Sequence, residues 1–274
     1  MASVNRRVLP GFSLTLGYTV FYLSVLVLLP IAACFFKAGS LSFEEFWAAV
    51  WTDRARAAYS LTFGAAFIAA IINLFLGLLL AWVLIRYTFP GKKLVDSLVD
   101  LPLALPTAVG GLVYASLYVE KGWLGQFLVP LGIQGAYSRL AIVLVLVFVG
   151  LPFVVRTVQP VLEDLDPEYE EAAASLGGTR WQTFRDVILP TLSPALITGF
   201  ALAFSRGIGE YGSVVFVSGN MPYKTEIAPI LIVARLEEFA YGEATAIAVV
   251  LLTISFSMLV VINLLERWSM RHER

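Results

Sequence analysis

The sequence predicts an all-α integral membrane protein with six transmembrane helices. Hydrophobic residues make up 59% of its 274 residues and charged residues only 14%, whereas soluble domains carry about 25% charged residues. Uncharged stretches occupy residues 14–36, 61–85, 101–119, 140–155, 187–205 and 244–265. A helix needs roughly 20 apolar residues to cross the hydrocarbon core, and continuous runs of this kind exclude a barrel of alternating strands.

The individual spans follow from these runs in order. The first run comes after Arg6 and Arg7 and so resembles a secretory signal, but it is longer than the roughly 7–15 apolar residues of such signals. It is therefore predicted to be a retained helix, in which Cys34 is a small apolar residue. The fourth run is short, and it reaches a sufficient length if residues 135–138 extend it while Arg139 snorkels to the interface.

The third span contains two prolines, Pro102 and Pro106, each of which removes a helix hydrogen bond and predicts a kink. A broken helix suits a gate that must bend, and ordinary kinked packing is equally compatible with the pattern. Both interpretations remain open at this point.

The distribution of Lys and Arg predicts the orientation, because cytoplasmic loops carry an excess of these residues. With the N-terminus inside, the inner side holds eleven of them: Arg6, Arg7, Arg86, Lys92, Lys93, Arg156, Arg180, Arg185, Arg267, Arg271 and Arg274. The outer side holds seven: Lys37, Arg54, Arg56, Lys121, Arg139, Lys224 and Arg235. Both termini are therefore expected in the cytoplasm, together with the polar segment at residues 163–190.

This polar segment carries helix-capping signals. Asp166 is a good N-cap, and Pro167 suits the first helical position. Gly177 can adopt the left-handed conformation that ends a helix, and Thr179 with Gln182 forms a capping box that starts the next one. The pattern predicts two short helices around a glycine corner.

The charge of the segment bears on what it contacts. Residues 163–190 hold seven acidic residues against Arg180 and Arg185, which would repel a phosphate backbone and argues against a DNA reader. The chain as a whole has a net charge of −1, and nothing predicts nucleic-acid binding. Two interpretations remain: a solvated linker, or a rigid projection that a cytoplasmic partner contacts.

The segment resembles the EAA motif of the permeases of ABC importers. Glu171, Ala172, Ala173 and Gly177 fall at the motif's spacing, and Val187 stands in place of the usual isoleucine before the closing residues Leu189 and Pro190. The resemblance implies a type I ABC importer permease fold. It also implies that the segment forms coupling helices, which dock into a cleft of an ATP-hydrolysing subunit.

The same resemblance divides the chain. It implies a transmembrane domain at residues 59–263 with the coupling loop at about 163–190. The preceding residues 1–58 would form a tail, an additional first helix and an outer loop, and residues 264–274 a cytoplasmic tail.

Charged residues near the end of the fifth span form a second candidate site. Arg206 and Glu210 are four residues apart, so on a helix they would face the same side. Arg206 could present positive charge to an anion in a translocation path, with Ser205 and Ser213 as hydrogen-bond donors. Alternatively the two residues form an internal ion pair that fixes packing.

Residues 204–220, 221–232 and 101–111 resemble the T-type permeases of sulfate/thiosulfate ABC importers. This resemblance implies a non-catalytic transmembrane subunit in a bacterial inner membrane. Its implied partners are a paralogous W-type permease, two ATPase subunits and a periplasmic sulfate- or thiosulfate-binding protein.

No cofactor is expected in this chain. It lacks the phosphate-binding loop of an ATPase, so its partners would use the ATP, and its single histidine, His272, argues against a histidine-based metal site. Two alternatives to the sulfate/thiosulfate interpretation are a homodimeric molybdate or tungstate permease and, more distantly, an ion-coupled secondary transporter.

Overall fold

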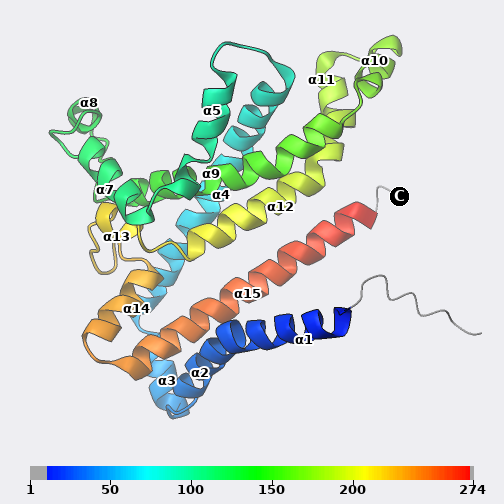
Figure 1. The fold of residues 1–274 in the computed structure, drawn as a ribbon. Coiled ribbons are helices and arrows are strands. Elements are labelled where there is room, and N and C mark those ends of the chain that lie inside the picture. The colour runs from blue at the N-terminus through cyan, green and yellow to red at the C-terminus, as the bar shows by residue number, and fades with distance from the viewer. Residues whose placement is uncertain (1–10, 272–274) are drawn as a thin grey trace, which may run out of the picture.

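The computed structural model describes residues 11–271 and is helical throughout these residues apart from turns and loops (Figure 1). The predicted residues Arg6, Arg7, His272 and Arg274 lie outside the described range. In chain order the elements are α1 (Phe12–Leu23), the π-helical η1 (Ser24–Leu28), α2 (Leu29–Ala38), α3 (Phe43–Val50), α4 (Asp53–Arg86), α5 (Lys92–Val99), α6 (Leu101–Ala104), α7 (Thr107–Tyr118), α8 (Gly125–Leu128), the 3-10 turn η2 (Val129–Leu131), α9 (Arg139–Asp164), α10 (Pro167–Ser175), α11 (Arg180–Thr183), the π-helical η3 (Phe184–Ile188), α12 (Leu189–Ile208), α13 (Val214–Val217), α14 (Ala228–Glu237) and α15 (Tyr241–Arg271).

Within the described residues, five continuous helical segments are long and apolar enough to cross a membrane: Leu14–Ala38, Asp53–Arg86, Arg139–Asp164, Arg180–Ile208 and Tyr241–Leu264. They coincide with the first, second, fourth, fifth and sixth predicted spans. The third predicted span is not one helix, because the chain leaves the helical conformation at Leu105 and Pro106, between α6 and α7. The residue before a proline is biased toward an extended conformation, and Leu105 adopts one with ψ 138°.

The centre of the bundle is formed by α4, α9 and α12, which pack against one another. Small residues let these helices approach closely, as is usual in membranes. A Cβ atom added to Gly77 of α4 would lie 2.7 Å from the side chain of Val154 in α9, and one added to Gly207 of α12 would lie 3.2 Å from Ala66 in α4. The three central helices are thus too close at these two positions for a larger residue to fit without displacement.

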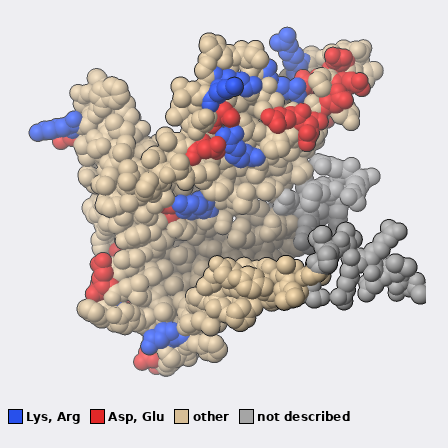
Figure 2. All heavy atoms as spheres, in the orientation of Figure 1, with Lys and Arg blue, Asp and Glu red and all other residues tan. Residues whose placement is uncertain are grey.

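The two ends of the bundle carry different features (Figure 1). The start of α1, the corner between α10 and α11, and the end of α15 lie toward one end, and α3 and α14 lie at the other. Figure 2 shows acidic and basic side chains gathered over the end that carries α5, α10 and α11. We call this the α10 end and the opposite one the α14 end.

Candidate coupling site and translocation path

Helix α10 begins and ends as its sequence predicts. The Asp166 side chain accepts a hydrogen bond from the Glu168 N–H at 3.0 Å, and Pro167 is the first helical residue. Gly177 has φ +83°, and the N–H of Gly178 donates to the Ala173 carbonyl at 2.9 Å. The N-cap and the left-handed glycine that closes the helix are both confirmed.

The prediction of a second short helix is wrong. Thr179 and Gln182 do form a capping box, with the Thr179 N–H donating to Gln182 Oε1 at 2.8 Å. From there α11, η3 and α12 form one continuous helical segment, so Leu189 and Pro190 lie inside it. A π-helical turn ends at Ile188, two residues before Pro190, and such turns accommodate a proline in a membrane helix.

The residues that carry the EAA resemblance are on the outside of α10 and of the corner that follows it. Glu171, Ala172 and Gly177 are exposed, and Ala173 is half-buried. Figure 1 shows α10 projecting beyond the central helices. This part of the chain therefore presents a surface to solvent or to a partner.

Three large apolar side chains, which sequence reasoning missed, are exposed on the same projection. Leu176 is 89% exposed, Trp181 67% and Tyr169 60%. Leu176 lies immediately before the glycine corner, and that position was the one signal in the sequence that could have found it. Three large apolar side chains exposed on one short projection favour a protein–protein contact there.

The other side of α10 is attached to the chain itself. Glu170 forms an ion pair with Arg86 at the end of α4, and the Arg86 guanidinium lies 5.5 Å from the centre of the Trp82 ring. The Trp82 ring in turn packs edge-on against Phe184, at 5.9 Å between ring centres. The two neighbouring glutamates thus differ: Glu170 holds α10 in place and Glu171 is exposed.

Arg206 and Glu210 form an ion pair, although Glu210 is not on the same helix because α12 ends at Ile208. Glu210 is 1% exposed, and the Ser213 N–H and hydroxyl donate to its Oε1 at 2.9 and 2.7 Å. Arg206 is partly exposed and Ser205 half-buried. The internal pair is therefore formed, and an anion that approached Arg206 would compete with the Glu210 carboxylate.

The broken third span lies directly against this site. A Cβ atom on Gly111 of α7 would lie 2.2 Å from the Ser213 carbonyl oxygen, and one on Gly212 would lie 2.1 Å from the Thr107 hydroxyl. Pro102 is buried in α6, and Pro106 lies at the break that precedes α7. The structure thus brings the predicted gate element and the turn that carries Glu210 into contact.

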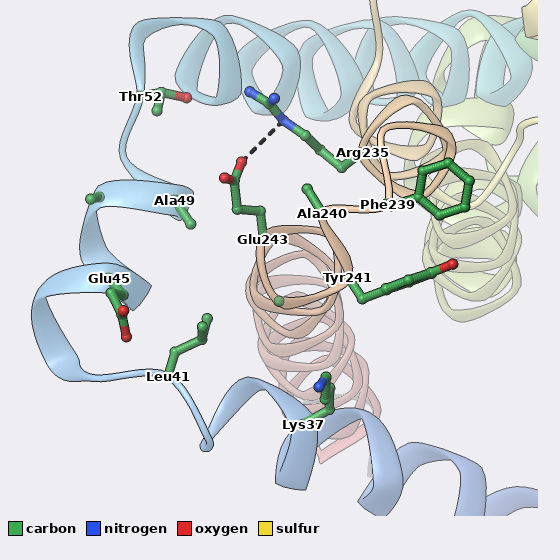
Figure 3. Close-up of a pocket in the computed structure, with 12 residues that line it drawn as sticks. Lys37, Leu41, Glu45, Ala49, Thr52, Arg235, Phe239, Ala240, Tyr241 and Glu243 are labelled. Carbon is green, nitrogen blue, oxygen red and sulfur yellow. Dashed lines mark ion pairs between the residues drawn. The ribbon is translucent and has the colours of Figure 1, made fainter.

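A recess of about 770 Å³ opens at the α14 end between α2, α3, α14 and the start of α15 (Figure 3). Arg235 occupies its wall and pairs with Glu238 at 2.6 Å and with Glu243 at 3.3 Å. Lys37 and Glu45 line the opposite side. Glu238 and Glu243 are thus paired with a basic residue of the same chain.

Across the part of the chain that the structure describes, no group of three or more His, Cys, Asp or Glu side chains is arranged to hold a metal ion. The ion pairs of these residues form within one helix, between helices, or between a helix and a turn.

The fold and the site together define a class: a helical membrane bundle with a polar projection at one end and a broken helix packed against the turn that carries the buried Glu210. Residues 73–271 match the family described as "Binding-protein-dependent transport system inner membrane component". The chain belongs to this family of membrane transport components. The match does not test the predicted domain limits at residues 58 and 263, which stay predictions.

Several curated proteins are similar to this chain over nearly its whole length. The "Sulfate transport system permease protein CysT" of Salmonella typhimurium is 50% identical over 266 residues, which is 97% of this chain and 96% of that protein. The protein of the same name from Synechocystis is 52% identical over 254 residues, or 93% of this chain and 89% of that protein.

Two solved structures share the fold. A chain of a bacterial ABC transporter involved in the import of alginate superposes with a TM-score of 0.78 and 14% identity, and covers 93% of this chain and 94% of that one. A chain of an alginate ABC transporter in complex with an alginate pentasaccharide-bound periplasmic protein has a TM-score of 0.76 and 18% identity over 93% of each chain. These likenesses establish the type I importer permease fold predicted from the sequence.

Proposed function

We propose that this chain is the transmembrane permease subunit of an ATP-driven sulfate/thiosulfate importer of a bacterial inner membrane, with both termini in the cytoplasm. The observation that carries the proposal is the identity of about half of all residues, along nearly the full length, with permeases named for sulfate transport. These names favour sulfate over molybdate or tungstate. Membership of a binding-protein-dependent transport family argues against an ion-coupled secondary transporter.

In this proposal the chain itself catalyses nothing, and two ATPase subunits hydrolyse the ATP. The coupling residues Glu171, Ala172, Ala173 and Gly177 dock into a cleft of one ATPase subunit. Leu176 supplies apolar contact area at the tip of that surface, where its side chain is almost fully exposed. A paralogous W-type permease completes the membrane part, and a periplasmic binding protein delivers the anion at the α14 end.

The anion path in this proposal runs past α7 and the Arg206–Glu210 pair, with Pro102 and Pro106 at the gate. The close contact between α7 and Ser213 supports this assignment, because a bend at Pro106 would move the turn that carries Glu210. Ser205 and Ser213 are hydrogen-bond donors near the pair. Arg206 would become available to an anion when that turn moves and its bond to Glu210 lengthens.

Purification of the tagged chain from membranes tests the complex. Mass spectrometry of the co-purifying proteins should find an ATPase and a second, non-identical permease. Recovery of an ATPase with only this permease would instead support a homodimeric oxyanion importer, and recovery of no ATPase would contradict the coupling role.

Uptake into proteoliposomes that hold the purified complex tests the substrate. Labelled sulfate should enter only with ATP inside and a loaded binding protein outside. Unlabelled thiosulfate should compete with it and molybdate should not. Uptake that molybdate abolishes and thiosulfate leaves unchanged would overturn the assignment.

A further inference from the structure

A cluster of hydrogen-bonded charged and polar side chains joins α9 to the α5–α6 segment, and it shares no residue with the coupling segment or the Arg206–Glu210 pair. It consists of Arg156 and Gln159 of α9 with Asp96 and Asp100, and we call it the Arg156 cluster. The Arg156 guanidinium forks onto the Asp100 carboxylate, with Nε–Oδ1 2.8 Å and Nη2–Oδ2 2.6 Å. It also donates to the Asp96 carboxylate at 2.7 Å and to the Asp96 carbonyl at 2.8 Å.

Gln159 completes the cluster from the next turn of α9. Its Oε1 accepts from Arg156 Nη1 at 2.5 Å, and its Nε2 donates to the Asp96 carboxylate at 3.2 Å. A forked arginine–carboxylate contact fixes direction as well as distance, which a lysine cannot reproduce. The α5–α6 segment is therefore held to one turn of α9 in a defined orientation.

That turn is one of two in α9 that lack a backbone hydrogen bond, because Pro152 and Pro160 both lie inside the helix. Pro160 lies inside α9 and has no N–H to donate to the carbonyl four residues earlier, which is that of Arg156. Prolines inside helices are the usual places where a helix bends. The Arg156 side chain thus ties α9 to a neighbour at the turn that Pro160 weakens, which we call the hinge of α9.

On one side the hinge leads to the coupling segment. The end of α9 at Asp164 is eight residues beyond Arg156, or ~12 Å along a helix. Only Leu165 and Asp166 separate it from α10, and Leu165 is buried in the central core. A displacement of α10 is therefore passed to the Arg156 turn through a short, packed connection.

On the other side the cluster leads to the gate element. Asp100 directly precedes α6, and α6 is separated from α7 only by the break at Leu105 and Pro106. α7 in turn contacts the Ser213 backbone. A movement of α5 and α6 is thus transmitted to the turn that holds Glu210.

We infer that Arg156 is a positioning residue that transmits the movement of the coupling helix α10 to the α5–α7 gate element, with Asp96 and Asp100 as its anchors. This inference rests on the proposed function, since it presupposes that an ATPase moves α10. It concerns a contact within this chain and adds no contact with the ATPase or with the anion.

The test compares Arg156→Lys with a matched control at the other end of the bundle. Arg54 also forks onto a carboxylate, that of Glu226, at 2.8 and 2.7 Å, but it joins α4 to a turn at the α14 end. Arg54→Lys therefore weakens a contact of similar geometry that is not part of the inferred connection. Both variants are measured in the full complex, reconstituted in proteoliposomes with the binding protein.

The readout is labelled sulfate imported per ATP hydrolysed, together with the amount of assembled complex. Arg156→Lys should lower that ratio about fivefold, which is the usual size of a change in coupling between sites, while assembly stays normal. Arg54→Lys should leave the ratio unchanged. A structural clamp would lower the amount of complex or its thermal stability without altering the ratio, and that result would overturn the inference.

If the complex with Arg156→Lys does not assemble, the complex with Asp100→Asn tests the inference instead, because this substitution keeps the arginine and removes only the charge of one anchor. A lowered ratio in Asp100→Asn supports the inference and an unchanged ratio overturns it. Wild-type complex that imports no sulfate at all would contradict the proposed function itself. If the wild-type complex transports sulfate and the variants import as much sulfate per ATP as the wild type, the inference about Arg156 is wrong while the proposed function stands.

Discussion

Substitution of Gly177 removes a backbone conformation that the corner of the coupling segment requires. Gly177 has φ +83°, and a Cβ atom added there would meet no other atom within 4 Å. The free-energy cost of a side chain at this position therefore comes only from the left-handed backbone conformation, and it is about 1–2 kcal/mol for an L-residue. That lowers the ratio of formed to unformed corner by about 5- to 30-fold.

A series of side chains at this position separates conformation from bulk. The backbone cost of Gly177→Val should lie at the upper end of this range of about 1–2 kcal/mol, because β-branched residues are outliers at positive φ. The cost of Gly177→Asn should lie at the lower end, because asparagine tolerates a positive φ. Retention of the ATPase during purification and ATP-driven sulfate uptake should fall strongly for valine and little for asparagine. Membrane insertion should be the same in both variants.

Gly132 provides the control for this series. It has φ +79°, likewise has nothing within 4 Å of an added Cβ atom, and lies in the loop between α8 and α9. Gly132→Val imposes the same local strain outside the coupling segment and should leave ATPase retention unchanged. Equal losses in the two valine variants, or normal uptake in Gly177→Val, would refute the reasoning.

Three further outcomes are expected. Glu171→Lys should weaken retention of the ATPase without lowering the thermal unfolding temperature, because the carboxylate is exposed. Arg206→Gln should lower the unfolding temperature by leaving buried Glu210 unpaired, and adding Glu210→Gln should restore most of it; an unchanged temperature in the single variant would contradict a structural pair. Hydrogen bonds from Arg156 lower the pKa of Asp96, so its ionised form stabilises the fold above the ordinary value of 3.8 and that stabilisation is lost as pH falls further. Asp96→Asn should therefore flatten the fall of the unfolding temperature below about pH 4.

The local signals in the sequence predicted the helix caps and the corner of the coupling segment, but not the continuity of α11 with α12. Capping by Asp166 and Thr179 and the corner at Gly177 depend on residues within four positions of one another, so the sequence contains all the information they need. The long apolar runs likewise predicted five continuous spans. The break in the third span at Pro106 was predicted only as a kink, because two prolines do not reveal which one interrupts the helix.

Contacts between distant positions could not be predicted in this way. The Glu170–Arg86 pair joins residues 84 positions apart, and Arg156 reaches Asp100 across 56 positions. Nothing in the local pattern distinguishes Glu170, which is bound within the chain, from Glu171, which is exposed. That distinction follows only from the packing of α10 against the end of α4.

The continuity of α11, η3 and α12 changes how the coupling segment acts on the membrane part. A second short helix would have allowed the glycine corner to move without moving the fifth span. Instead Trp181, the second residue of α11, and Arg206 lie on one helical segment from Arg180 to Ile208. The corner therefore lies at one end of a continuous helical segment, and the other end carries Arg206, the ion-pair partner of the buried Glu210. Movement of α10 then reaches the Arg206–Glu210 pair by two routes. One route runs along α12 and moves Arg206. The other runs through α9, the Arg156 cluster and α7 and moves the turn that carries Glu210. The pair would separate when the two displacements differ.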